Sequence, residues 1–219
     1  MSDWHHNARH DLINHIPEGT RTVLDVGCHT GATLDALREK GYLATGMDIQ
    51  DNRIDKNCKF IQGDLGEAML AAAYKGTMFD CVIAGDTIEH VANTQQGLMN
   101  LYDALRRGGT LILSVPNIGW IENALKILNQ EFPREENGPF DGTHLRWFTR
   151  KTIVEHIENA GFRNLRTFAV YLTDGCPKYP EGAPFAEVRF GEVTFHKITP
   201  QHFAELFAYQ WIVVAEKPL

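Results

Sequence analysis

Short apolar runs alternate with segments of helical spacing through the first half of the chain. Each run ends at glycine, proline or a polar residue, as buried strands commonly do. Five runs are predicted strands: 21–27, 43–49, 59–64, 79–84 and 110–115. Four further segments are predicted helices: 7–15, 30–40, 67–74 and 94–107. Strands that are apolar along their whole length indicate a parallel sheet with helices on both faces, and therefore a doubly wound α/β fold. Such a fold binds ligands beyond the carboxyl ends of its strands.

The second half of the chain is less regular. It contains predicted helices and strands at 118–129, 149–161, 162–172 and 211–216. Residues 173–210 hold four of the nine prolines. Because 219 residues fit one domain, we predict a single domain over 1–219. The segments 117–148 and 173–210 are then insertions that cover the ligand site.

Composition narrows the range of partners. With 43% hydrophobic residues the chain can build a packed core, and a net charge of −7 gives no electrostatic reason to bind nucleic acid or an anionic membrane. The cysteines form no Cys-x-x-Cys pair, which argues against a zinc knuckle or a disulfide framework: Cys28, Cys58, Cys81 and Cys176. The polar N-terminus and the absence of an 18-residue apolar run predict a cytoplasmic protein with neither signal peptide nor membrane span.

A loop with two glycines, Asp25–Gly31, follows the first predicted strand. Glycine at such a place lets a ligand approach the backbone closely. The dinucleotide-binding pattern Gly-x-Gly-x-x-Gly, begun at Gly27, would need glycine at position 29, where this chain has His29. A nicotinamide-dependent oxidoreductase is therefore disfavoured.

Aspartates stand at the ends of four successive predicted strands: Asp25, Asp48, Asp64 and Asp86. A single aspartate at a strand end commonly forms a turn. Four in this order predict a ring of carboxylates around one crevice, because the carboxyl ends of parallel strands lie at the same edge of the sheet.

The chain resembles the class I S-adenosylmethionine-dependent methyltransferases. The segments that carry the resemblance are Val23–Gly31, Gly46–Ile49, Gln62–Leu65, Phe79–Ile83 and Leu105–Leu111. It implies a Rossmann-like methyltransferase fold, with a mostly parallel seven-stranded sheet whose last strand is antiparallel, and S-adenosylmethionine as cofactor. In that family the glycine loop contacts the amino acid part of the cofactor, the Asp48 position binds the ribose, and Asp64 with the Leu65 amide contacts adenine. The cofactor-binding residues implied are Asp25, Gly27, Cys28, His29, Gly31, Asp48, Ile49, Asp64, Leu65 and Asp86.

Two more segments, Asp86–Val91 and Gly142–Thr149, resemble small-molecule methyltransferases of the ubiquinone-pathway type. His144 is the candidate general base, since the ordinary pKa of histidine lies near neutrality, and Glu89 is the second candidate. The Asn/Asp-Pro-Pro-Tyr/Phe motif of amino-directed nucleic-acid methyltransferases is absent, which argues against a DNA substrate.

Asp86, Glu89 and His90 would share one face of a helix. With His144 they are ligand types that Mg, Mn or Zn accept, and some RNA-end methyltransferases with a similar segment hold a metal in this way. The segment Asp86–Glu89 also has the form of a helix capping box. We expect no metal, and a metal-assisted or RNA-directed methyltransferase remains an alternative.

The predicted reaction is methyl transfer from S-adenosylmethionine to an oxygen or nitrogen of a small molecule. The insertions 117–148 and 173–210 then form a lid and the acceptor site. Aromatic residues in the second insertion either shape an apolar acceptor pocket or pack against the sheet: Tyr179, Phe185, Phe190 and Phe195. The other alternative is a non-catalytic S-adenosylmethionine-binding regulatory module, which needs no open acceptor pocket. The identity of the acceptor and the oligomeric state stay open.

Overall fold

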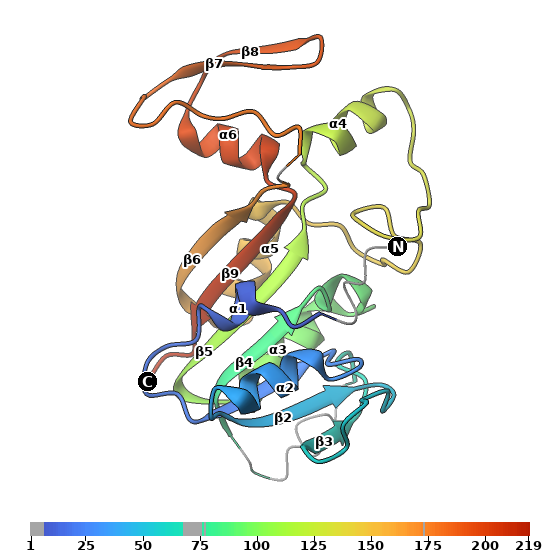
Figure 1. Ribbon diagram of the computed structural model, residues 1–219, viewed down its shortest axis with the longest axis vertical. Coiled ribbons are helices and arrows are strands. Elements are labelled where there is room, and N and C mark those ends of the chain that lie inside the picture. Colours follow the sequence, from blue (N-terminus) through green and yellow to red (C-terminus); the bar gives the residue numbers. More distant parts are fainter. Residues whose placement is uncertain (1–6, 68–75, 77, 173) are drawn as a thin grey trace.

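The computed structural model describes residues 7–67, 76, 78–172 and 174–219. Seven strands form one sheet in the order β3–β2–β1–β4–β5–β9–β6 (Figure 1). Their bounds are β1 Thr22–Val26, β2 Leu43–Asp48, β3 Lys59–Gln62, β4 Phe79–Gly85, β5 Leu105–Pro116, β6 Arg163–Val170 and β9 Gln210–Glu216. Strand β9 runs antiparallel to both β5 and β6, whereas the pairs formed by β1 to β5 are parallel. The predicted fold class is confirmed.

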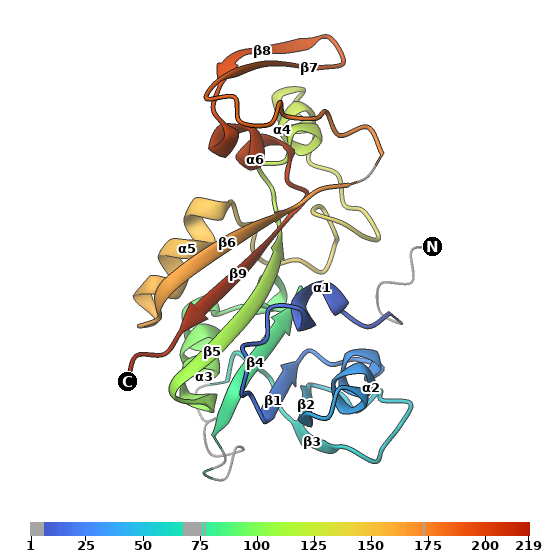
Figure 2. The ribbon, with the colours of Figure 1, turned by 60° about the vertical axis from the view of Figure 1, so that its left-hand side comes forward.

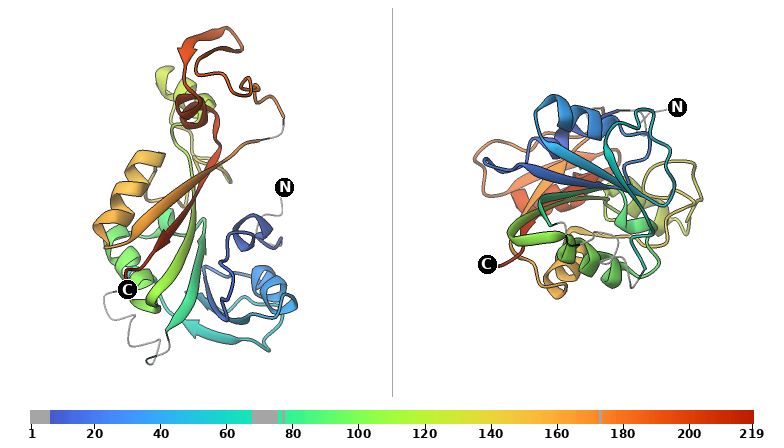
Figure 3. Two further views of the ribbon diagram at one scale, coloured as in Figure 1. Left: turned by 90° about the vertical axis from the view of Figure 1, so that its left-hand side faces the viewer. Right: turned by 90° about the horizontal axis from the view of Figure 1, so that it is seen from below.

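Helices cover both faces of the sheet (Figures 2 and 3). On one face lie α1 (His10–Ile13) and α2 (Ala32–Glu39), whose leucines pack with the buried residues of β1 and β4. On the other lie α3 (Thr94–Ala104) and α5 (Arg150–Asn159), which bury residues against the central strands. Buried strands between two helical layers explain the continuous apolar runs in the sequence. Within the described part of the chain, no helix combines the length and the apolar character needed to cross a membrane.

The predicted helix 67–74 falls almost entirely outside the described residues. The helix predicted to reach residue 107 ends at Ala104, because the chain extends there and joins β5. Backbone hydrogen bonds with Lys217 hold this extension: Gly108 N–H donates to the Lys217 carbonyl and Lys217 N–H to the Gly109 carbonyl, both at 2.9 Å.

A small cap lies beyond the carboxyl ends of β5 and β6 (Figure 1). We use this name for four elements: α4 (Ile121–Leu128), β7 (Ala186–Phe190), β8 (Val193–Ile198) and α6 (Pro200–Phe207). The hairpin β7–β8 was not predicted, although its two strands alternate apolar and polar residues around Gly191. The predicted insertion therefore has a structure of its own.

The aromatic residues of the cap pack with one another. The rings of Phe190 and Phe195 lie 5.8 and 5.9 Å from that of Phe207, centroid to centroid. Tyr179 contacts the Phe203 ring and donates its hydroxyl to the Ile198 carbonyl at 2.9 Å. Tyr179, Phe190 and Phe195 thus pack within the cap and not against the sheet, whereas Phe185 is 51% exposed. None of the four lines either of the two cavities described below.

The connections between the cap and the sheet lie close together, at the ends of β5 and β6 and the start of β9. Val170 at the end of β6 pairs with Gln210 at the start of β9, and Tyr209 N–H donates to the Val170 carbonyl at 2.8 Å. The side-chain amide of Asn117, just after β5, donates to the carbonyls of Glu205 and Ala208. Tyr209 and Gln210 are therefore held beside the carboxyl end of β5, next to the site described below.

Candidate cofactor and acceptor sites

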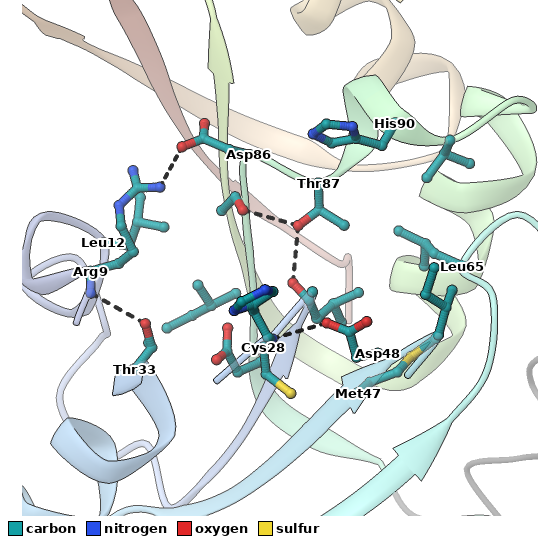
Figure 4. A pocket seen from close by; sticks show the side chains of 18 of the residues that line it. Arg9, Leu12, Cys28, Thr33, Met47, Asp48, Leu65, Asp86, Thr87 and His90 are labelled. Atoms are coloured by element: carbon teal, nitrogen blue, oxygen red, sulfur yellow. Dashed lines mark hydrogen bonds and ion pairs between the residues drawn. The ribbon is translucent and has the colours of Figure 1, made fainter. Parts of the chain in front are cut away.

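A cavity of about 430 Å³ lies at the carboxyl ends of β1, β2 and β4 (Figure 4). Nine of the ten residues predicted to bind cofactor line it: Asp25, Gly27, Cys28, His29, Asp48, Ile49, Asp64, Leu65 and Asp86. We call it the cofactor cavity. The tenth, Gly31, is not among the lining residues; it precedes α2 with φ +88°, a turn conformation that glycine adopts without strain. The predicted ring of carboxylates is thus brought together at one edge of the sheet.

The backbone at Gly27 lies against Thr87, in the loop that follows β4. Its φ is +74°, and a Cβ added there would be 2.5 Å from the hydroxyl oxygen of Thr87. That hydroxyl lies 3.1 Å from the Val26 carbonyl oxygen and 3.0 Å from that of Gly85. Glycine is therefore required at this position by both conformation and space.

His29 adopts the backbone conformation that a glycine would supply. Its φ is +43°, in the left-handed region, and its N–H donates to the Asp48 carboxylate at 2.9 Å (Figure 4). Histidine is among the residues that tolerate this region better than most. The turn thus places Asp48, at the end of β2, on the floor of the cavity.

Asp25 is 5% exposed, and one of its carboxylate oxygens has no hydrogen-bond partner in the described structure. Burial raises its pKa to about 7; the positive charge of Arg9 opposes this shift and the negative charge of Asp48 adds to it. The cavity therefore contains a carboxyl group that titrates near neutrality and whose charged form a cation would stabilise.

Arg9 is a site residue that no sequence motif points to. It lines the cavity, and its guanidinium donates to Asp86 at 2.6 Å (Figure 4). It also donates to Ser114 at 3.2 Å and to Gln210 at 3.1 Å. Burial alone would lower the pKa of Arg9, but the carboxylates of Asp86 and Asp11 outweigh it and hold that pKa above its ordinary value. Arg9 stays charged and fixes the N-terminal segment over the cavity.

A second cavity of about 470 Å³ adjoins the first. Asp86 and His90 line both cavities. The second is completed by residues 135–138 and 141–144 from one predicted insertion and by Tyr209 and Gln210 at the end of the other. We call it the acceptor cavity.

The segment after β4 differs from the predicted helix. Only Ile88–His90 form a turn of 3-10 helix, η3, and Asp86 precedes it with φ +48°. The prediction that Asp86, Glu89 and His90 share one helical face is wrong, because this left-handed residue breaks helical continuity. The capping box is also not formed: no side chain caps η3, and Asp86 instead accepts hydrogen bonds from Arg9, Ser114 and Gln210.

Glu89 is 1% exposed and lines the acceptor cavity. Neither of its carboxylate oxygens has a hydrogen-bond partner in the described structure. Burial raises its pKa well above the ordinary value, and the negative charge of Asp86 adds to this shift. An unpaired buried carboxyl is costly, and this one faces a cavity.

His90 and His144 lie beside Glu89, with ring centroids 4.8 Å apart. One ligand atom from each of the three residues lies within 4.8 Å of the others. The predicted set of four is therefore reduced to three, since Asp86 is held by Arg9 and its neighbours. His144 is 7% exposed, whereas His90 is exposed. Partial desolvation of the His90 ring nevertheless lowers its pKa, and the adjacent His144 lowers it further.

The hydrogen bonds of the two imidazoles determine which ring nitrogens can accept. The Thr143 hydroxyl donates to Asp141 at 2.5 Å, so it accepts from His90 Nδ1 at 3.2 Å. His144 Nδ1 lies 3.2 Å from the Pro139 carbonyl, which can only accept. Both neutral imidazoles therefore carry their proton on Nδ1 and keep Nε2 as an acceptor.

The cofactor cavity fits S-adenosylmethionine by its donor set. Asp48 offers carboxylate oxygens for ribose hydroxyls at the end of β2, and Asp25 provides a buried carboxyl that a sulfonium cation would ionise. The glycine turn leaves backbone exposed at Gly27, where a larger residue would collide with Thr87. These features are all at the carboxyl ends of the strands, as this fold class requires.

Comparison with known proteins agrees with this geometry. Residues 5–167 match a protein family described as a methyltransferase domain. The ubiquinone biosynthesis O-methyltransferases of Rickettsia prowazekii and Rickettsia typhi are 27% and 30% identical to the chain over 126 residues. The match covers 51% of this chain in both cases, and 50% and 51% of those proteins. The chain thus spans about half the length of these relatives.

Solved structures show the same fold. An S-adenosylmethionine-dependent methyltransferase from Archaeoglobus fulgidus has a TM-score of 0.62 at 18% identity, covering 95% of this chain and 90% of that one. Phosphoethanolamine N-methyltransferase 2 of Haemonchus contortus, solved with S-adenosyl-L-methionine, has a TM-score of 0.56 at 13% identity, covering 96% and 53%. The family match over most of the chain, the sheet order and the cavity together identify the chain as a member of the class I S-adenosylmethionine-dependent methyltransferases.

Proposed function

We propose that the enzyme methylates an oxygen or nitrogen of a small molecule bound in the acceptor cavity. The observation that carries this proposal is the junction of the two cavities, where Asp86 and His90 line both. S-adenosylmethionine supplies the methyl group as an activated sulfonium. The protein therefore has to position the two molecules, and positioning alone contributes about 7–11 kcal/mol in favourable cases.

The cofactor cavity has a polar group for each part of the cofactor. Asp48 binds the ribose hydroxyls, and Asp64 with the Leu65 amide binds the adenine edge. The loop Gly27–Gly31 follows the amino acid part. The position of Asp48 at the end of β2 and its bond from His29 N–H support this arrangement, because they orient the carboxylate toward the cavity.

On the acceptor side, His144 is the proposed general base. Its Nδ1 is bound to the Pro139 carbonyl, which leaves Nε2 free to take a proton from a hydroxyl or an ammonium group. Its low exposure keeps competing water away. Glu89, beside it, is the second group able to receive a proton.

The size and lining of the acceptor cavity support a small molecule. The cavity has about 470 Å³, within the range of ordinary ligand pockets. Its described lining contains no lysine or arginine, which is unfavourable for an RNA phosphate backbone. The presence of the cavity also weighs against a purely regulatory cofactor-binding module. The two Rickettsia relatives are named as O-methyltransferases of ubiquinone biosynthesis, which agrees with a small acceptor.

Calorimetry with S-adenosylhomocysteine tests the cofactor part of the proposal. Asp48→Ala should weaken binding at least tenfold, whereas Asp55→Ala should not, because Asp55 pairs with Arg38 outside the cavity. Equal affinities for the two variants would contradict the assignment of Asp48.

The acceptor part is tested by turnover. Release of S-adenosylhomocysteine is measured with a collection of small hydroxyl and amino compounds. His144→Ala should retain S-adenosylhomocysteine affinity and lower turnover about 10²-fold or more. Unchanged turnover in this variant would show that His144 is not the general base.

A further inference from the structure

The acceptor cavity is lined by carboxyl groups, of which some form an ion pair and others do not. Two of them are paired with cations: Asp86 with Arg9 at 2.6 Å and Glu135 with Lys126 at 2.7 Å. The other three have no ion pair in the described part of the chain: Glu89, Glu136 and Asp141. The cavity therefore carries excess negative charge at neutral pH, with no positively charged side chain on its described wall.

Glu89 is the member of this set that requires a ligand. It is 1% exposed, both oxygens lack partners, and it faces the cavity. Glu136, by contrast, is exposed and can be hydrated, and Asp141 accepts hydrogen bonds from Thr143 N–H and its hydroxyl. A buried carboxyl is left without partners only at a cost, which a bound donor or cation removes.

The two imidazoles beside Glu89 each carry an acceptor nitrogen. The hydrogen bonds of His90 to Thr143 and of His144 to Pro139 leave both Nε2 atoms with a lone pair. A ligand at this point must therefore supply several N–H or O–H donors, or be a metal ion.

The spacing of the three residues accommodates an ammonium group. The three ligand atoms lie within 4.8 Å of one another. Three acceptors placed about 2.8 Å from a tetrahedral ammonium nitrogen are about 4.6 Å apart, which is close to that limit. Ligands of a tetrahedral zinc ion, at about 2.1 Å, are about 3.4 Å apart, which lies within the same limit.

We propose that Glu89, His90 and His144 bind a protonated primary amine, so that the acceptor of this methyltransferase is a small amine that binds in its cationic form. His144 Nε2 then takes one N–H proton, the nitrogen lone pair forms the bond to the methyl carbon, and the carbon–sulfur bond of S-adenosylmethionine breaks to leave neutral S-adenosylhomocysteine. The inference rests on the proposed function, because it names the class of molecule that enters the acceptor cavity. The three N–H donors of the ammonium satisfy the Glu89 carboxylate and the two Nε2 atoms, and the unpaired carboxylates of the wall attract the cation.

The test uses the full chain saturated with S-adenosylhomocysteine at pH 7. Ethylamine, butylamine and phenethylamine are titrated, each against the alcohol of the same carbon skeleton, while the imidazole signals of the histidines are followed by NMR. At least one amine should bind at least tenfold more tightly than its alcohol and shift the signals of His90 and His144. In Glu89→Gln this preference should disappear.

Glu136→Gln is the matched control, since it removes one negative charge from the same wall but not from the group of three. It should retain the amine preference. If no amine is preferred, or if Glu89→Gln keeps the preference, the proposal is overturned. A parallel Zn²⁺ and Mg²⁺ titration identifies a metal as the occupant in that event.

Failure of this inference can be told apart from failure of the proposed function. S-adenosylhomocysteine binding that depends on Asp48, with no preference for amines, would leave the methyltransferase proposal standing and remove only the amine. Unchanged S-adenosylhomocysteine affinity in Glu89→Gln shows that the variant is folded.

Discussion

The guanidinium of Arg9 lies 2.6 Å from the carboxylate of Asp86, although 77 positions separate the two residues in the chain. This contact ties the N-terminal segment to the loop after β4, at the junction of the two cavities. Asp86 also accepts hydrogen bonds from Ser114 on β5 and Gln210 on β9. One carboxylate therefore joins four separate parts of the chain.

Arg9→Met should lower the free energy of unfolding by about 2 kcal/mol, because it leaves Asp86 without its cation while Asp86 is only partly exposed. The control is Arg106→Met, which breaks the pair with Asp80 but removes an arginine whose side chain is 51% exposed. Its loss should stay below about 1 kcal/mol. Urea denaturation measures both, and equal losses would show that the Arg9 pair has no special role.

The contact between Gly27 and Thr87 gives a second prediction. Gly27→Ala combines an unfavourable φ of +74° with a Cβ placed 2.5 Å from a hydroxyl oxygen. Gly19→Ala isolates the first effect, because Gly19 has φ +81° and nothing within 4 Å of an added Cβ. We expect a loss of about 1–2 kcal/mol for Gly19→Ala, and a larger one for Gly27→Ala together with weaker S-adenosylhomocysteine binding. Similar losses would mean that Thr87 moves aside freely.

Only some of these contacts could be predicted from the sequence. The strands and the glycine loop were predictable because their signals are continuous in the chain: a buried run, a glycine and an aspartate at its end. Arg9 and Gln210 were not, since their partners lie 77 and 124 positions away from them and neither residue stands in a recognisable motif.

The segment after β4 illustrates a different limit. Spacing alone placed Asp86, Glu89 and His90 on one helical face, but the left-handed φ of Asp86 and the 3-10 turn that follows depend on tertiary contacts with Arg9, Ser114 and Gln210. The hairpin β7–β8, by contrast, has a local signal in the alternation of apolar and polar residues on both sides of Gly191.

Asp25 predicts how stability changes with pH. Its pKa is about 7 in the folded protein, above the ordinary value of 3.8, so between these values the folded state holds a proton that the unfolded state has lost. Stability from this group therefore falls as pH rises from about 4 to about 7, by up to about 4 kcal/mol.

Asp25→Asn should remove this dependence. The unfolding free energy of the variant relative to the natural protein should increase from pH 4 to pH 8, as measured by denaturation at several pH values. Asp35→Asn is the control, because the Asp35 side chain is 45% exposed and pairs only with Arg38 in the described structure. If the difference in unfolding free energy between Asp25→Asn and the natural protein does not change with pH, then Asp25 does not titrate in this pH range.

The same carboxyl should make cofactor affinity depend on pH in a way that reveals the cofactor's charge. S-adenosylmethionine carries a sulfonium cation, whereas S-adenosylhomocysteine has a neutral sulfur and is otherwise alike. Since Asp25 lines the cavity and titrates near pH 7, its charged form should favour the sulfonium. The ratio of the two affinities, measured by calorimetry, should therefore shift toward S-adenosylmethionine between pH 6 and pH 8. In Asp25→Asn the affinity ratio should stay constant with pH. In the control Glu89→Gln, which changes the acceptor cavity, the ratio should still shift. A ratio that stays constant with pH in the natural protein would mean that the charge of Asp25 does not affect binding of the sulfonium.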